Sequence, residues 1–489
     1  MEDQHRAAVP QLRAGALKFP AVLMQGITHI APAVGLVLSI QYITSLSGVV
    51  APLAYAIAVL IMLALGISLA QLARHFPSAG GYYTYISRTV NPRAGFLTAW
   101  LYLLYDPIAT AINIAFMGIF FERAMLGAYH IRFPWWLFFL LMLALLTFVV
   151  FRGIAPSTHV MVFSGLAEIA IVLALAAWGL LKPGPGGVNL DSYLPARSPS
   201  PGGLALGIIF SIFSVAGFDG VVPLAEESAD PRRTLPRAIL ASILLTGLFY
   251  LFCSWAVLIG WGTQHIASFA ASPENPCFLL ARKFWGKAWI FILLAVLNSV
   301  FAVSIASTNA ATRVLFALGR SGLLPRALGK IHSANRTPSN AIWLQTFITL
   351  VVGLGLGFWV GPEQEFYLVG VVITLCLVII YSLANYGVFR FYRSERESDF
   401  RITYHLLCPL VSSLALLVVA FESIYSRPPP PVRYAPLVVI SWFALGIGLL
   451  LLYRKLGREE SVLEAGSKIV QLFEHSVHTP GKSHKDLLS

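Results

Sequence analysis

The chain has 489 residues, of which 57% are hydrophobic and only 11% are charged, and its net charge is +12. A soluble domain carries about 25% charged residues, so this chain has too few of them to cover a water-exposed surface. The composition excludes an ordinary soluble protein and indicates a polytopic membrane protein. The four cysteines are scattered without metal-ligand spacing and indicate no metal site.

Twelve apolar runs of about 20 residues, each long enough to cross a bilayer core, follow one another along the chain. The first run is too long for a secretory signal and lacks its small-residue cleavage site, so we expect it to remain as a helix. We predict an all-α polytopic membrane protein with twelve transmembrane helices between polar tails at 1–20 and 455–489. The runs cover residues 21–45, 49–73, 94–121, 134–151, 156–181, 203–228, 236–261, 286–319, 340–360, 365–390, 403–424 and 433–453.

The positive charge is distributed as expected for a membrane protein. With twelve spans both tails lie on the same side, and most of the 34 Lys and Arg residues fall in the tails and in the connections on that side. The positive-inside rule then places both termini in the cytoplasm and the Pro- and Gly-rich loop 182–203 outside, in a cell membrane. The basic excess therefore reflects topology and does not indicate a nucleic-acid partner.

Two of the apolar runs are interrupted near their middles. The first contains THIAPAVG (28–35), and the sixth contains AGFDG (216–220) followed by Pro223. If runs 1–5 and 6–10 form two repeats, the breaks occupy corresponding positions, as in transporters whose site lies at the bilayer midplane. The alternative is that the proline only kinks its helix and the glycines permit close packing.

Three acidic residues lie inside apolar runs: Asp106, Glu168 and Asp219. A charged side chain at the centre of a membrane helix costs about 2.5–3.5 kcal/mol on insertion scales, so such residues are candidates for function. Two alternatives stay open. Asp106 precedes Pro107 and could satisfy local backbone groups, and Glu168 could form a structural pair with a neighbouring helix.

Four stretches then carry a resemblance to a known family. The chain resembles the amino acid–polyamine–organocation (APC) superfamily at helix 6, at the exit of helix 2, and at the ends of helices 8 and 10. Asp230-Pro231 stands where the family has Asn-Pro, and Gln71 where a glutamate is common. The stretches are GFDGVVPLAEESADPRRTLPRAI (217–239), SLAQLARHFPSAGGYYTYISR (68–88), NAATRVLFALGRSGLLP (309–325) and YSLANYGVFRFYR (381–393).

The resemblance implies a LeuT-type fold with two inverted five-helix repeats and two peripheral helices. The transport core would cover residues 21–393, with repeats at about 21–181 and 203–390, and the peripheral helices would lie in 394–454. The resemblance also implies alternating-access transport of amino acids, polyamines or related amines. It implies no enzymatic activity and no cofactor other than a coupling ion. The chain departs from the family in having Glu168 where proton-coupled members often carry lysine.

The breaks give a candidate substrate site. Unpaired amides after the first break suit a carboxylate, and the carbonyls freed around Ser214–Gly217 suit an ammonium group. The resemblance adds Phe218 as an aromatic gate, which we expect to be an exposed flap, and we place Asp219 near the ammonium. Asp106 joins the site if it faces the pocket. The remaining substrate-binding candidates are the residues of the first break, Ile30, Ala31, Pro32, Ala33 and Val34, where Pro32–Val34 replace the family's glycine-containing sequence.

Coupling can be predicted in two ways. Asp106 and Glu168 are candidates for proton coupling, which together with Asp219 favours a proton-coupled carrier of neutral or cationic amino acids or amines. Ser304, Ser307 and Thr308 could bind sodium instead, or serve only in helix packing. The alternative function is a sodium-coupled or exchange carrier of another small organic amine or a non-amino-acid solute.

A histidine in the first break and a charged cluster after the sixth run are two further candidates for function. His29 lies in the first break, where it could titrate near physiological pH or serve as a hydrogen-bonded wall residue. Several charged residues stand together after the sixth run, and we expect them to form a gating or structural ion-pair network at the cytoplasmic end. These residues are Glu226, Glu227, Asp230, Arg232, Arg233 and Arg237.

Overall fold

The computed structural model describes residues 12–332, 335–425 and 429–457. Most of the two predicted tails, at 1–11 and 458–489, therefore lies outside the described residues. The described part is helical and contains no β-strand, only an isolated bridge between Leu17 and Ser228.

The helices of the first half are α1 Phe19–Ile30, α2 Pro32–Val37, α3 Ile40–Ser47, α4 Ala51–His75, α5 Tyr82–Thr89, α6 Pro92–Tyr102, α7 Asp106–Tyr129, α8 Trp135–Phe151 and α9 Ile154–Leu181. The second half contains α10 Pro201–Val215, the 3-10 helix η4 Phe218–Glu227, α11 Pro231–Trp261, α12 Ile266–Ala270, α13 Pro276–Trp285, α14 Ile290–Ser321, α15 Ser339–Val360, α16 Pro362–Ser394, α17 Cys408–Tyr425 and α18 Ala435–Lys455. Short 3-10 or π turns connect several of them.

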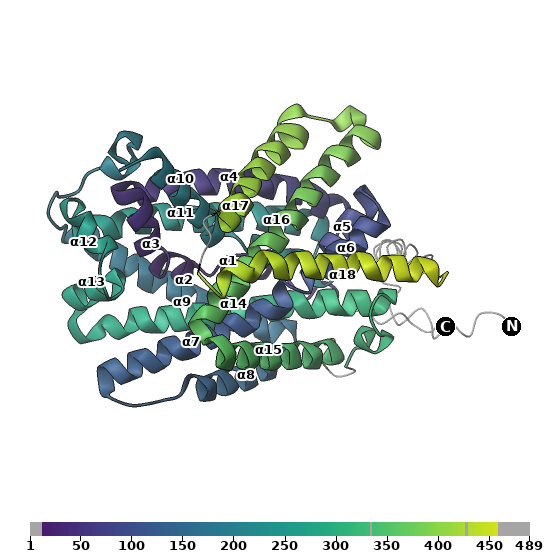
Figure 1. The fold of residues 1–489 in the computed structure, drawn as a ribbon, viewed down its shortest axis with the longest axis horizontal. Helices are drawn as coiled ribbons and strands as arrows, with labels where there is room; N and C mark the ends of the chain where they lie inside the picture. The colour runs from purple at the N-terminus through teal and green to yellow at the C-terminus, as the bar shows by residue number, and fades with distance from the viewer. Residues whose placement is uncertain (1–11, 333–334, 426–428, 458–489) are drawn as a thin grey trace, which may run out of the picture.

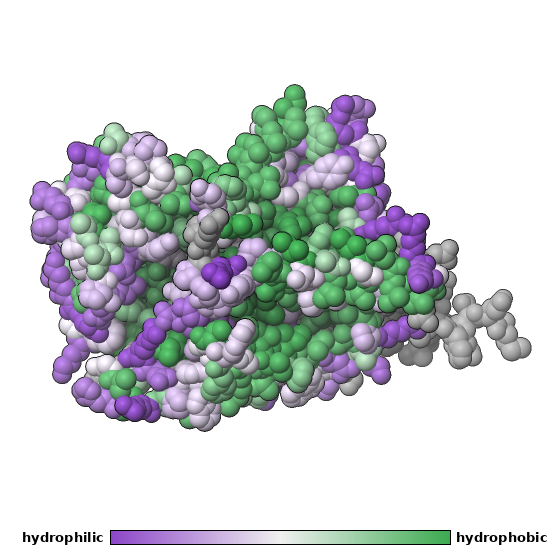
Figure 2. All heavy atoms as spheres, in the orientation of Figure 1, coloured by the Kyte–Doolittle hydropathy of each residue, from purple (hydrophilic) through white to green (hydrophobic). Residues whose placement is uncertain are grey.

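Most of the long helices run roughly parallel in one bundle, α16 and α17 are inclined to them, and α12 and α13 lie at one end (Figure 1). Hydrophobic residues cover most of the middle of the displayed face, and hydrophilic residues gather towards its two ends (Figure 2). Within the described residues, 11 helical segments are long and apolar enough to cross a membrane. The run predicted at 134–151 forms α8, which with 17 residues is shorter than the others. The chain is therefore a multi-pass membrane protein.

The first predicted break is present. Helix α1 ends at Ile30, Ala31 adopts a left-handed conformation with φ 59°, and α2 begins at Pro32. Proline lacks a backbone N–H and clashes with the preceding turn, so it can begin a helix but not continue one. The polypeptide therefore leaves the helical path for one residue inside the membrane.

The second predicted break is also present. Helix α10 ends at Val215, and the chain turns through Ala216 and Gly217 before η4 begins at Phe218. Gly217 has φ +110°, a conformation that favours glycine, and a Cβ atom on it would lie 2.6 Å from the carbonyl oxygen of His29. The two breaks therefore touch through their backbones, and this contact requires glycine.

A third break was not predicted. The run at 94–121 is divided into α6 and α7, with Leu103–Tyr105 forming a turn between them. Asp106 is the first residue of α7, and Pro107 follows it in the first turn, where proline is accommodated. This turn places a buried carboxylate beside the other two breaks.

The bundle is held by one large apolar core. Helix α4 packs closely along α11, and both belong to the same hydrophobic cluster. In this contact Gly247 of α11 faces the Val59 side chain, and a Cβ atom at Gly247 would lie 2.6 Å from it. Small residues at such contacts let membrane helices approach closely, so the broken helices are set against a tightly packed frame.

Candidate functional site

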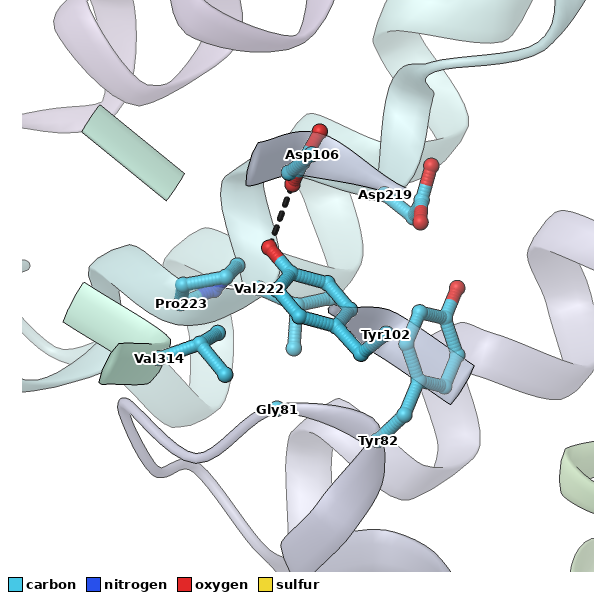
Figure 3. Close-up of a pocket in the computed structure, with 8 residues that line it drawn as sticks. All are labelled: Gly81, Tyr82, Tyr102, Asp106, Asp219, Val222, Pro223 and Val314. Atoms are coloured by element: carbon cyan, nitrogen blue, oxygen red, sulfur yellow. Dashed lines mark hydrogen bonds between the residues drawn. The ribbon is translucent and has the colours of Figure 1, made fainter. Parts of the chain in front are cut away.

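A small enclosed cavity of about 10 Å³ lies beside the breaks. Figure 3 shows the side chains of Asp106 and Asp219 at one end of this cavity and Gly81 at the other. The lining combines two carboxylates with aromatic and aliphatic groups. It consists of Gly81, Tyr82, Tyr102, Asp106, Asp219, Val222, Pro223 and Val314.

Asp106 is the centre of one polar cluster. It is 1% exposed, and its Oδ1 lies 3.2 Å from His29 Nε2. The hydroxyl of Tyr102 donates a hydrogen bond to its Oδ2. His29 Nε2 also lies 3.0 Å from the Ser307 hydroxyl. The carboxylate therefore faces the pocket and joins α7 to the first break and, through His29, to Ser307 of α14.

Asp219 is the centre of a second cluster, built mainly from tyrosines. The hydroxyl of Tyr381 donates to Asp219 Oδ1 at 2.9 Å, and Tyr105 approaches the same oxygen at 3.5 Å. Asp219 is 3% exposed and has no ion-pair partner among the residues that the structure describes. A buried carboxylate of this kind, surrounded by aromatic rings, is suited to an alkylammonium group.

Phe218 corrects one expectation. Its ring is fully buried and stacks on Tyr381, with ring centroids 6.3 Å apart. The prediction of an exposed flap is therefore wrong for this structure. The reason is that η4 follows Gly217 directly and turns the ring inward, into the apolar core shared with α16.

The carbonyl of Ser214 also differs from the expectation of a freed acceptor. It accepts a hydrogen bond from the Tyr250 hydroxyl at 3.0 Å. The neighbouring Tyr55 hydroxyl donates to the carbonyl of Gly35 in α2 at 3.1 Å. Aromatic hydroxyls from α4 and α11 therefore satisfy backbone groups next to both breaks, as is required where backbone polar groups are removed from water.

Glu168 of α9 lies on the other side of the first break. Its Oε1 accepts a hydrogen bond from the Ser299 hydroxyl at 3.0 Å, and its Oε2 accepts one from the Asn298 amide at 3.0 Å. The Val34 amide donates to the same Ser299 hydroxyl at 3.4 Å. The carboxylate is 1% exposed. Glu168 therefore faces the residues that were expected to receive a substrate carboxylate.

The three hydroxyl residues of α14 are all engaged with protein groups. Ser304 donates to the carbonyl of Val300 at 2.8 Å, one turn earlier in the same helix. Thr308 lies 3.2 Å from the Thr110 hydroxyl of α7. Ser307 contacts His29, as described above. Within the described residues, no group of three or more His, Cys, Asp or Glu side chains could hold a metal ion.

An ion-pair network joins the end of η4 to α14. Arg313 pairs with Glu227 at 2.8 Å, and both side chains are 1% exposed. Arg320 pairs with Glu226 at 2.5 Å. Glu226 and Glu227 therefore form ion pairs, as expected. Their partners are arginines of α14 and not the arginines close to them in the sequence. The exposed pair of Asp230 and Arg233, at 3.6 Å, is local in sequence.

Sequence reasoning missed the tyrosines that surround the carboxylates. Tyr102 and Tyr105 immediately precede Asp106 in LYLLYDPIAT, and Tyr381 opens a stretch that was recognised for another reason. Tyrosines beside an intramembrane acid were the available signal, because a buried carboxylate needs hydrogen-bond donors. Ser299 and Asn298 gave no such signal, since only the packing of α14 on α9 brings them to Glu168.

These features define a class of protein. The chain is a multi-pass membrane permease, with broken helices meeting around buried carboxylates inside the bundle. Consistent with this, a family model described as amino acid permease matches residues 21–455. The chain belongs to the amino acid permease family, within the APC superfamily, whose members are transporters and not enzymes.

Three curated relatives illustrate the range of the family. The chain is 29% identical to the low-affinity putrescine importer PlaP of Escherichia coli K12, over 68% of this chain and 72% of that protein. It is 22% identical to the branched-chain amino acid permease BcaP of Lactococcus lactis, over 82% and 86% of the two chains. It is 25% identical to the methylthioribose transporter of Bacillus subtilis, over 79% and 82%.

Proposed function

We propose that this protein is a secondary active transporter that moves an amine or an amino acid across the cell membrane by alternating access, coupled to protons. The observation that carries the proposal is the meeting of the α1/α2 and α10/η4 breaks beside buried Asp106 and Asp219. Irregular backbone and acidic side chains are expensive inside a membrane and are typical of a transport pathway.

The proposed architecture is the LeuT-type arrangement of two inverted repeats, at about 21–181 and 203–390. Its support is that the two broken helices open the two halves and that α4 and α11, the next long helices of each half, pack together. In this arrangement α8 also crosses the membrane and brings the eleven longer segments to twelve spans. Its 17 apolar residues lie at the short end of the range that can cross a bilayer.

The proposed substrate site is the cavity with its two carboxylates and the residues of the breaks, Ile30–Val34 and Ser214–Asp219. A ligand larger than a water molecule requires the surrounding helices to move, because the cavity measures only about 10 Å³. Asp219, without an ion-pair partner among the described residues, is the proposed contact for a positively charged amine. The same carboxylates disfavour acidic amino acids through like-charge repulsion.

The proposed coupling group is the His29–Asp106 pair. A proton on His29 would be stabilised by the Asp106 carboxylate at 3.2 Å, and its loss would leave a buried anion. Because His29 lies in the first break itself, a change in its protonation acts on the segment that rearranges. Glu168 is a second coupling candidate, and Ser304, Ser307 and Thr308 belong to the sodium alternative.

The proton mechanism makes a prediction about pH. Uptake into proteoliposomes by the native protein will increase when the outside is acidic relative to the inside. Asp106→Asn removes the anion that stabilises protonated His29, so uptake by this variant will respond little to the gradient. Asp191→Asn, on the outer loop, is the matched control and will behave like the native protein. Unchanged pH profiles in Asp106→Asn, with uptake abolished by sodium removal, would favour sodium coupling.

The proposed orientation places both termini in the cytoplasm and the 182–203 loop outside. A cysteine at Ser198, in that loop, will then react with a membrane-impermeant maleimide in intact cells. A cysteine at Ser394, at the end of α16, will react only after the cells are opened. The native protein provides the background, since Cys253, Cys277 and Cys376 are buried and Cys408 is half-buried. Labelling of Ser394→Cys but not Ser198→Cys in intact cells would reverse the orientation.

A second candidate function is a carrier of a non-amino-acid solute on the same fold. The similarity to the methylthioribose transporter favours it. A thermal-shift screen of the purified protein against amines, amino acids and thiosugars separates the two, because a ligand that binds the folded state raises its apparent stability. A shift with thiosugars alone would support the second candidate.

A further inference from the structure

We propose that the substrate of this transporter is an amine cation that carries no carboxylate, because the protein supplies its own carboxylate, that of Glu168, at the position where an amino acid would place one. This inference rests on the proposed function and makes its substrate class more specific.

The first step concerns the amides of the α1/α2 break. Ala31 turns out of the helix, so the helix that begins at Pro32 is new. The backbone N–H groups of Ala33 and Val34 lie in its first turn, where no helical carbonyl is available to accept from them. Free amides at the start of a helix are suited to a substrate carboxylate. Here they are used by the protein: the Val34 amide donates to Ser299, and Ser299 donates to Glu168.

The second step concerns how firmly Glu168 is held. Each of its two oxygens accepts a side-chain hydrogen bond at 3.0 Å, one from Ser299 and one from Asn298. Asn298 is itself fixed, because its amide also donates to the carbonyl of Ser164 at 2.8 Å. An incoming carboxylate would have to displace this network and compete with Glu168 for the same donors.

The charged groups near the breaks also favour a cationic substrate. Asp106 has His29 as an ion-pair partner, whereas Asp219 has none among the described residues. The buried Arg313 is occupied by Glu227. The described groups near the breaks therefore offer an unpaired anion for an ammonium and no unpaired cation for a carboxylate.

Aromatic side chains beside Asp219 supply further contacts for an amine. Tyr82 lines the cavity, is 5% exposed, and its hydroxyl has no hydrogen-bond partner within the part of the chain that the structure describes. Its ring lies 5.7 Å from that of Tyr381, which in turn holds Asp219. Aromatic faces beside an anion bind alkylammonium groups by cation–π attraction. An unpartnered hydroxyl next to them is a donor or acceptor for a second polar group.

The test compares molecules that differ only by a carboxylate. The probes are cadaverine against lysine, agmatine against arginine, and isoamylamine against leucine, each titrated against the purified full-length protein by thermal shift. We expect the decarboxylated member of at least one pair to bind at least tenfold more tightly than its amino acid. If no member of any pair binds, the proposed function fails. If the amino acids bind as well as the amines or better, only this inference is overturned.

A variant pair assigns the discrimination to Glu168. Glu168→Gln replaces the carboxylate that occupies the place of a substrate carboxylate, so the preference for the amine will fall to about threefold or less. Glu365→Gln is the matched control, because Glu365 is also a fully buried membrane glutamate but lies near α15, away from the breaks. It will keep the native preference. A Glu168→Gln variant that keeps the preference, and loses only its response to a pH gradient, would make Glu168 a coupling group and overturn the inference.

Discussion

Asp219→Asn will reduce kcat/KM for uptake by about 10- to 100-fold without unfolding the protein. Asparagine keeps the size of the side chain and an oxygen that can accept from Tyr381, but it removes the charge that we assign to the substrate ammonium. A hydrogen bond to a charged group contributes about 1.5–3 kcal/mol, and 1.4 kcal/mol corresponds to a factor of ten. Uptake and melting temperature are measured on the same purified preparation.

Two controls accompany this variant. Asp399→Asn, an exposed change between α16 and α17, will leave uptake unchanged. Tyr381→Phe removes the donor to Asp219 at 2.9 Å while keeping the ring, and will give a smaller loss than Asp219→Asn. Native uptake by Asp219→Asn would show that the substrate does not bind to this carboxylate.

Glu227→Gln will strongly destabilise the fold. It leaves the Arg313 guanidinium, 1% exposed, without its anion. Removing one partner of a buried ion pair costs about 3–5 kcal/mol, because the remaining charge stays out of water. The melting temperature of the detergent-solubilised protein will fall clearly below that of the native chain.

The double variant Glu227→Gln with Arg313→Met separates charge from packing. It removes both charges and will recover much of the lost stability, since a buried pair can often be replaced by apolar groups at little cost. Arg233→Gln breaks the exposed pair with Asp230 and will change stability by at most about 1 kcal/mol. A Glu227→Gln protein as stable as the native one would mean that Arg313 reaches another partner or water.

The elements that the sequence predicted well are those set by backbone chemistry. Pro32 forced a helix start, and Gly217 allowed the turn before η4, so both breaks could be located from residue types alone. The third break, before Asp106, was missed because LYLLY is apolar throughout and Pro107 is tolerated in a first turn. Twelve apolar runs were visible, although α8 is shorter than the rest.

Side-chain partners could be predicted less well. Glu227 has three arginines close in sequence, yet it pairs with Arg313, 86 residues away. Phe218 was expected at an open gate and is buried on Tyr381. Asp106 and His29 were separate candidates, and only the packing of α7 against the first break makes them a pair. Such pairings depend on how helices cross, which residue types do not specify.

The most direct test of the proposed transport is uptake by the purified protein in proteoliposomes with an alkaline interior. The external solution contains radiolabelled cadaverine, agmatine, arginine or leucine in separate trials, with protein-free vesicles as the blank. The account predicts that at least one of these molecules accumulates above its external concentration without sodium, and that a protonophore abolishes the accumulation. Absence of accumulation for all four, or accumulation that requires sodium and survives the protonophore, would contradict it.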